Sequence, residues 1–187
     1  MPSLMSFGEL KILFHEFGHI MNYMSYKGDY SMLALSKSDF HEAMSNLFEN
    51  WLDDYEIISS FAKHHKTKEV FPKSLFEAMS RANNVSSGLK AQSILKSCIY
   101  DMTIYDKYNP KEPIDTDFLW KEIDSNVGYM PSFIDGTHPQ ASWIHINTNP
   151  VYYYGYLWSD VYSKDMFTVF KENGLRDSET GIRYKEI

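Results

Sequence analysis

Two histidines and a glutamate near the N-terminus have a spacing that suits metal chemistry. His15 and His19 are four residues apart, and Glu16 directly follows the first of them. Because residues four apart project from the same face of a helix, both imidazoles can meet one tetrahedral ion. A Zn²⁺ ion lowers the pKa of a water that it binds to about 7, and a neighbouring carboxylate can take up the released proton. The pattern therefore predicts a zinc site with Glu16 as the general base.

The same short pattern also occurs by chance on solvated amphipathic helices that bind no metal. The flanking residues argue against this alternative, because Leu13, Phe14 and Phe17 make the surroundings apolar. Two histidines and a glutamate are costly in such surroundings unless they are paired or bind an ion. The local sequence therefore favours a ligand site.

A catalytic zinc site needs a third protein ligand. The stretch 38–51 offers three carboxylates for this role, namely Asp39, Glu42 and Glu49. Spacing alone does not choose among them.

Two long helices are expected to position these groups. Ser6 and Glu9 have the spacing of a capping box, and the periodic apolar residues after them predict a helix over 7–26. Ser38 is expected to cap a second long helix over 38–62, in which apolar residues recur every three or four positions. The metal site should lie between these two helices.

Helical patterns also dominate the rest of the chain. Further helices are predicted from Pro72 to about Ala82, from beyond Asn83-Asn84 to about Tyr105, and over 117–125. Residues 128–149 predict a long loop, because prolines and glycines interrupt any period. A final aromatic helix is predicted over 151–171, and the residues beyond it show no clear period. The expected fold is all-α, in one domain.

Composition excludes several classes of protein. With 25 Asp and Glu against 18 Lys and Arg, the net charge is −7 and the basic residues are scattered, so no nucleic-acid partner is expected. No run approaches the roughly 20 apolar residues of a membrane span, and a hydrophobic share of 43% is too high for disorder. The single cysteine, Cys98, is read as an inert helix-face residue, and nothing marks export, so a cytoplasmic location is expected.

Two separate stretches carry a resemblance to a known family. Residues 14–21 read Phe-His-Glu-Phe-Gly-His-Ile-Met, and Asp39-Phe40-His41-Glu42 stands a few residues before Glu49-Asn50-Trp51. Both stretches resemble the thimet oligopeptidase family of zinc metallopeptidases, which includes neurolysin, bacterial oligopeptidase A and dipeptidyl carboxypeptidase. The resemblance implies a helical, zincin-like catalytic region with one Zn²⁺ per chain. It also implies that Glu42 is the third ligand, because the family's ligand is the glutamate of an acidic-Phe-x-Glu segment.

The resemblance implies three more functional residues. Residues 153–159, Tyr-Tyr-Gly-Tyr-Leu-Trp-Ser, look like a family segment whose first and third tyrosines face the substrate, here Tyr153 and Tyr156. Tyrosines three apart share a helix face, and a phenol can donate a hydrogen bond to a carbonyl oxygen as it gains charge. The alternative for each is an aromatic core stripe. His145 follows a stretch that is similar to the one before a family histidine near the scissile carbonyl. The resemblance therefore implies that His145, Tyr153 and Tyr156 are catalytic and substrate-binding residues.

The sequence departs from the family pattern between His145 and Tyr153. There the family usually has a glycine-rich loop with one more tyrosine that helps to bind the oxyanion. This chain instead has Asn149-Pro150-Val151-Tyr152, with Asn149 at or near the expected tyrosine and Tyr152 as a possible substitute. Without the glycine pair and with a proline, the segment should be stiffer than a loop that closes over substrate.

Family members are several times longer than this chain, although the resemblance covers nearly all of it. We therefore expect residues 1–187 to be a partial catalytic domain without the family's N-terminal half and final C-terminal segment. The first expectation for its function is a zinc-dependent metallo-endopeptidase that hydrolyses short oligopeptides. The alternatives are a catalytically impaired zinc-binding fragment, or one half of a two-chain peptidase whose partner is a complementary N-terminal chain.

Overall fold

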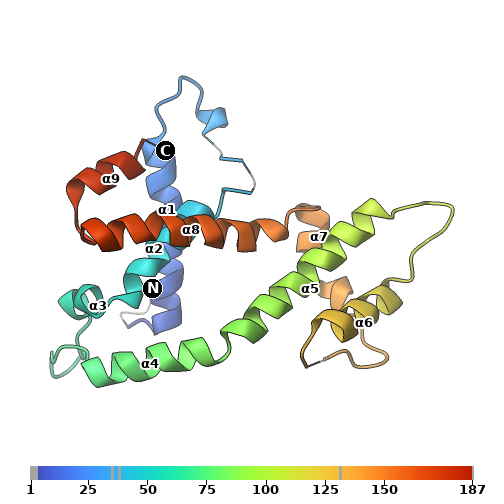
Figure 1. Cartoon of the computed structure of the whole chain (residues 1–187), viewed down its shortest axis with the longest axis horizontal. Coiled ribbons are helices and arrows are strands. Elements are labelled where there is room, and N and C mark those ends of the chain that lie inside the picture. Colours follow the sequence, from blue (N-terminus) through green and yellow to red (C-terminus); the bar gives the residue numbers. More distant parts are fainter. Residues whose placement is uncertain (1–3, 35, 38, 131, 187) are drawn as a thin grey trace. The chain divides into compact units, whose positions relative to one another are not determined.

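The computed structural model of the protein describes residues 4–34, 36–37, 39–130 and 132–186, and the fold over these residues is all-α, as the sequence predicted. Within the described residues the only β-type pairing is an isolated bridge between Lys63 and Val70. The α-helices are α1 Phe7–Ser25, α2 Ala43–Glu49, α3 Tyr55–Phe61, α4 Lys73–Val85, α5 Ser87–Asp106, α6 Thr116–Val127, α7 His145–Thr148, α8 Tyr154–Asn173 and α9 Ser178–Tyr184 (Figure 1). Short 3₁₀ helices are η1 Ser31–Leu33, η2 Asn50–Asp53 and η3 Pro139–Ser142.

The chain divides into two compact units, a division that the sequence did not predict. Unit 1 consists of Met1–Ala82 and Trp158–Ile187, and unit 2 consists of Asn83–Leu157. Helices α1, α2, α3 and α9 belong to unit 1, whereas α5, α6 and α7 belong to unit 2. A bilayer-crossing helix would have to be longer and more apolar than any in the described part of the chain.

The first predicted helix and its capping box are confirmed in α1. The Glu9 carboxylate accepts a hydrogen bond from the Ser6 amide at 2.7 Å, and the Ser6 hydroxyl accepts one from the Glu9 amide at 3.3 Å. Two amides that would lack partners at a bare helix start are satisfied in this way. The cap fixes where α1 begins, and α1 carries both His15 and His19.

The predicted second long helix is wrong in its length, because the structure divides it into α2, η2 and α3. The break falls at Asp54, whose backbone is extended and whose carboxylate accepts a hydrogen bond from the Ile57 amide at 3.0 Å. An aspartate in this position starts a new helix, and apolar spacing alone does not reveal it. Ser38, the predicted cap, lies outside the described residues, and α2 begins after Glu42.

Helices α1 and α2 approach so closely that only glycine fits between them. A Cβ atom on Gly18 would lie 2.6 Å from the Ser45 Cα and 2.7 Å from the Met44 carbonyl oxygen. Both obstacles are backbone atoms, so they cannot be relieved by a side-chain rotation. This contact holds the helix that carries both histidines against the one that follows Glu42.

Replacing Gly18 by Ala should therefore destabilise the chain by about 1–3 kcal/mol, the usual cost of overpacking, and weaken metal binding by separating α1 from α2. Urea denaturation and a zinc titration measure the two effects. The matched control is Gly8→Ala in the same helix, where an added Cβ meets nothing within 4 Å and helix propensity favours the change. Equal stability of the two variants would contradict the close approach.

Apolar clusters anchor each unit separately. In unit 1, Leu47 of α2 packs with Phe167 and Phe170 of α8. A second cluster of the same unit contains Leu52 and Ile58, and Phe14 of α1 packs against it. In unit 2, Tyr100 of α5 packs with Trp120 and Ile123 of α6. Core contacts thus fix both α1, which carries the two histidines, and α2, which follows Glu42.

The end of the chain and the predicted loop contain helices that the sequence analysis did not predict. Helix α9 starts at Asp177, whose carboxylate accepts a hydrogen bond from the Thr180 amide at 2.7 Å. The long loop over 128–149 contains η3 and the short α7, which begins at His145. The final aromatic helix is confirmed as α8, with a start at Tyr154 rather than residue 151.

Candidate metal centre

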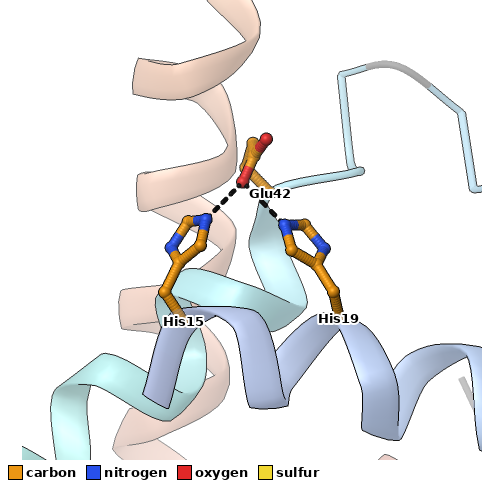
Figure 2. Close-up of side chains that lie close together, drawn as sticks. All are labelled: His15, His19 and Glu42. Carbon is orange, nitrogen blue, oxygen red and sulfur yellow. Dashed lines mark ion pairs between the residues drawn. The ribbon is translucent and has the colours of Figure 1, made fainter. Parts of the chain in front are cut away.

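His15, His19 and Glu42 converge in unit 1 (Figure 2). The two histidines lie on successive turns of α1, and their Nε2 atoms are 3.1 Å and 3.3 Å from the same carboxylate oxygen, Oε2 of Glu42. One ligand atom from each of the three residues can be chosen so that all three atoms lie within 4.8 Å of one another. Glu42 is 8% exposed and both histidine side chains are largely buried, so the cluster is shielded yet reachable.

The distances within this cluster fit a tetrahedral ion. Bonds of about 2.0–2.1 Å to nitrogen and oxygen place neighbouring ligand atoms roughly 3.3 Å apart around such an ion. The two nitrogen-to-oxygen distances, 3.1 Å and 3.3 Å, agree with that separation. Two imidazoles and one carboxylate leave a fourth position open, which is the usual donor set of a catalytic zinc site. The three residues could therefore hold a metal ion.

Glu49 lies on the far side of the His15 ring. Its Oε1 is 2.7 Å from His15 Nδ1, and its Oε2 pairs with Lys11 Nζ at 2.9 Å. A carboxylate on Nδ1 keeps the proton on that nitrogen and leaves Nε2 free to bind a metal. Glu49 stands seven residues, or two helical turns, after Glu42. This spacing was the signal in the sequence that could have predicted a second carboxylate on the same helix face as Glu42.

The structure separates the three carboxylates that spacing left open. Glu42 faces both histidine Nε2 atoms, Glu49 contacts only His15 Nδ1, and Asp39 does not belong to the cluster. Ser45, which the sequence analysis missed, donates a hydrogen bond from its buried hydroxyl to Glu42 Oε2 at 2.9 Å. This bond fixes the orientation of the carboxylate toward the histidines.

The surroundings of His19 and Glu16 differ from those of His15. His19 Nδ1 is buried and has no hydrogen-bond partner among the described residues, and the His19 ring stacks on His41 at 4.9 Å between centroids. Glu16 follows His15 on α1, and its side chain is exposed. Of the three apolar neighbours that favoured a ligand site, only Phe14 packs against a core cluster, whereas Leu13 is 44% and Phe17 48% exposed. The expectation of apolar surroundings is therefore confirmed only in part.

The charges in the cluster shift the pKa values of its members. Hydrogen bonds to Glu42 and then to Glu49 raise the pKa of His15 to about 9 in the metal-free chain. Burial acts to raise the pKa of Glu42, but hydrogen bonds from His15 and Ser45 outweigh it and hold that pKa at about 2. Burial lowers the pKa of His19. At neutral pH, without metal, His15 is therefore an imidazolium, which carries one proton more than the neutral ring.

Metal binding should consequently compete with that proton. Because the pKa of His15 is about 9, the competition is strong at pH 6.5 and vanishes above pH 9. The apparent zinc affinity should rise about tenfold per pH unit between pH 6.5 and 7.5. Calorimetric titrations in buffers of different ionisation enthalpy count the released protons. An affinity independent of pH in this window would mean that His15 is neutral without metal.

His145, Tyr153 and Tyr156 form a separate cluster in unit 2. His145 Nε2 is 2.8 Å from the Tyr156 hydroxyl, and the Tyr153 ring lies 5.3 Å from the His145 ring between centroids. Burial raises the pKa of Tyr153. Of the two candidates for the missing tyrosine, Asn149 is exposed at the end of α7, and the Tyr152 ring lies 5.8 Å from that of Tyr156. The structure thus brings these three residues together as one group.

Comparison with known proteins identifies the family of the chain. The chain matches the family model of peptidase family M3 over residues 1–187, and it belongs to that family. It is 30% identical over 193 residues to an organellar oligopeptidase A of Arabidopsis thaliana, with 98% of this chain and 24% of the relative covered.

Two further relatives show the same pattern. A thimet-like oligopeptidase of Dictyostelium discoideum is 31% identical over 189 residues, covering 98% of this chain and 28% of the relative. Oligopeptidase A of Escherichia coli (strain K12) is 31% identical over 184 residues, covering 96% of this chain and 27% of the relative. The chain thus spans about a quarter of the length of the curated relatives that it matches.

Proposed function

We propose that the chain carries the catalytic region of a zinc-dependent metallo-endopeptidase that hydrolyses peptide bonds in short oligopeptides. The observation that carries the proposal is the convergence of the His15 and His19 Nε2 atoms on Glu42 Oε2, with Glu16 exposed beside them. Membership of peptidase family M3 supports peptide hydrolysis, and the relatives' names supply the oligopeptide as substrate class.

His15, His19 and Glu42 would hold one Zn²⁺ ion. A bound zinc ion supplies Lewis acidity, which lowers the pKa of water to about 7 and polarises a carbonyl oxygen. Glu49 keeps the His15 proton on Nδ1, and Ser45 orients the Glu42 carboxylate. These contacts hold the ligand set in one arrangement before substrate arrives.

Glu16 is the proposed general base. Its carboxylate takes the proton from the attacking water and passes it to the leaving amine nitrogen, so one water adds across the peptide bond. The exposure of Glu16 supports this role, because a base must reach both the water and the substrate. No second carboxylate is needed for the step.

His145, Tyr153 and Tyr156 are the proposed substrate-binding and catalytic residues of unit 2. The hydrogen bond between His145 Nε2 and the Tyr156 hydroxyl orients both groups. When substrate binds, a phenol O–H and an imidazole N–H would donate hydrogen bonds to a carbonyl oxygen that gains negative charge, an effect commonly worth several kcal/mol. Either Tyr152 or Asn149 would replace the family tyrosine that this chain lacks.

Hydrolysis of an internally quenched fluorescent peptide tests the proposal. We expect turnover by the zinc-loaded chain, loss of turnover on chelation, and recovery when zinc is added back. Zinc content near one ion per chain without turnover would favour the impaired zinc-binding fragment or the two-chain peptidase. Turnover that appears only after a complementary chain is added would support the two-chain peptidase.

The cytoplasm is the proposed location. Cys98, the single cysteine of the sequence, is buried, and burial raises the pKa of its thiol to about 11. Such a thiol is poorly reactive and forms no internal disulfide, which suits a reducing compartment.

A further inference from the structure

Asp101 is a buried carboxylate of unit 2 to which the resemblance assigns no role. It lies on α5, is 1% exposed, and each of its oxygens accepts a backbone hydrogen bond. Oδ1 accepts from the Val151 amide at 3.0 Å, and Oδ2 accepts from the Tyr153 amide at 3.2 Å. One side chain thus holds the segment just before α8 on both sides of Tyr152.

The backbone that Asp101 holds has an unusual conformation. Val151 has a φ angle of 59°, in the left-handed region that a β-branched residue rarely adopts. Such a conformation is strained and persists only where surrounding contacts enforce it. Hydrogen bonds to a carboxylate are stronger than those to a neutral acceptor, so Asp101 is suited to enforce it.

The segment that Asp101 holds leads directly into the His145 cluster. The Tyr153 ring packs edge-on against Trp143 at 4.7 Å and lies 5.3 Å from the His145 ring, between centroids. It also lies 5.2 Å from the ring of Tyr156, whose hydroxyl is hydrogen-bonded to His145. A shift of the Tyr153 backbone would therefore disturb the environment of His145.

We propose that Asp101 is a positioning residue, which fixes the Val151 and Tyr153 amides so that Tyr153 and Tyr156 are held against His145. The effect of Asp101 on catalysis rests on the proposed function, whereas its effect on the position of the two tyrosines does not. Asp101 itself is buried and touches no substrate; it acts through Tyr153. In this way a segment without the flexible glycine pair of the resembled family presents its tyrosines in a fixed arrangement.

The test compares two buried carboxylates of the same unit. Asp101→Asn keeps the shape of the side chain. One of its two oxygens becomes an NH₂ group, which cannot accept the hydrogen bond of the backbone amide that faces it. The matched control is Asp124→Asn, because Asp124 is also 1% exposed and accepts hydrogen bonds from the Ser132 and Phe133 amides, besides pairing with Lys96. Both variants should lose stability, so stability alone does not distinguish positioning from general support.

The distinguishing measurement is the imidazole NMR spectrum of the histidine side chains, recorded on the whole chain. The His145 cross-peak is assigned as the one that disappears in His145→Gln. We expect it to shift or broaden in Asp101→Asn and to stay unchanged in Asp124→Asn, with the His15 and His19 signals unmoved in both. A His145 signal that does not move in Asp101→Asn, or that moves equally in Asp124→Asn, would overturn the proposal.

Two further measurements keep the test decisive if Asp101→Asn does not fold. In the unaltered chain, the Val151 and Tyr153 amide protons should exchange slowly with solvent, and fast exchange of either would overturn the proposal. Asp101→Asn is also made together with Val151→Gly, which removes the left-handed strain and so helps the variant to fold. One of the two amides still lacks its acceptor there, so the His145 signal should shift, and an unmoved signal would overturn the proposal.

Hydrolysis adds a readout that separates the two proposals. If the zinc-loaded chain is active, kcat should fall about tenfold or more in Asp101→Asn, because small misplacements of positioning groups are costly, while KM changes little. If the unaltered chain is inactive, the proposed function fails, yet the NMR comparison still decides whether Asp101 positions the cluster.

Discussion

Replacing Glu16 by Gln should reduce peptide hydrolysis by the zinc-loaded chain about 10²- to 10⁴-fold, the usual contribution of a general base. Gln keeps the size of the side chain but cannot accept the proton of the attacking water. Zinc content should stay the same, since Glu16 is exposed and is not one of the three converging residues. The measurement is turnover of a quenched fluorescent peptide, with zinc determined on the same samples.

The matched control for Glu16 is Glu56→Gln on α3, another exposed glutamate of unit 1. Its turnover should equal that of the unaltered chain. If Glu16→Gln keeps full activity, the proton acceptor is another group and the proposed mechanism is wrong. If it loses zinc together with activity, Glu16 supports the metal site rather than the proton transfer.

Removing the Glu42 carboxylate should weaken zinc binding more than any other single carboxylate change. We expect Glu42→Gln to lower the affinity by more than about 10³-fold, since loss of an outer partner typically costs only about 10–100-fold and a direct ligand contributes more. Glu49→Gln should fall within that smaller range, because Glu49 contacts His15 at Nδ1. Competition against a chromophoric zinc chelator measures all these affinities.

Asp39→Asn completes the comparison, because Asp39 lies outside the converging group and should leave the zinc affinity nearly unchanged. We expect the loss of zinc affinity to be largest for the change at Glu42, smaller at Glu49 and smallest at Asp39. A larger loss in Glu49→Gln than in Glu42→Gln would mean that the carboxylates exchange roles when the ion binds. Circular dichroism of each variant controls for loss of helix.

Local sequence signals predicted the helices that carry the site. The capping box at Ser6 and the periodic apolar residues after it fixed α1 within one residue of its observed end. The aromatic period of α8 was equally clear. Signals of this kind act within one or two helical turns, so they can be read without tertiary contacts.

Features that depend on one side-chain contact were missed. The periodic apolar residues continue through Asp54, yet its carboxylate caps a new helix there. The start of α9 similarly depends on Asp177, within a stretch that has no clear apolar period. The side chain of a short polar residue can end one helix and cap the next only where the backbone leaves the helical conformation. Whether the backbone does so depends on tertiary packing.

The choice of Glu42 among three carboxylates also needed more than spacing. It depends on where α2 begins relative to α1 and on the close approach at Gly18, which are tertiary properties. The family resemblance supplied the choice, and the geometry agrees with it. The catalytic roles of Glu16, His145, Tyr153 and Tyr156 stay predictions.

The candidate ligands lie close together along the chain, and this has a consequence for folding order. Only one loop, between His19 and Glu42, must close to bring them together, at an entropic cost on the order of 3 kcal/mol beyond a constant term. Contacts of short sequence separation form early, whereas those that join α2 to α8 span more than half of the chain. A metal ion could therefore bind the α1 and α2 pair, and stabilise it, before the C-terminal helices have folded onto unit 1.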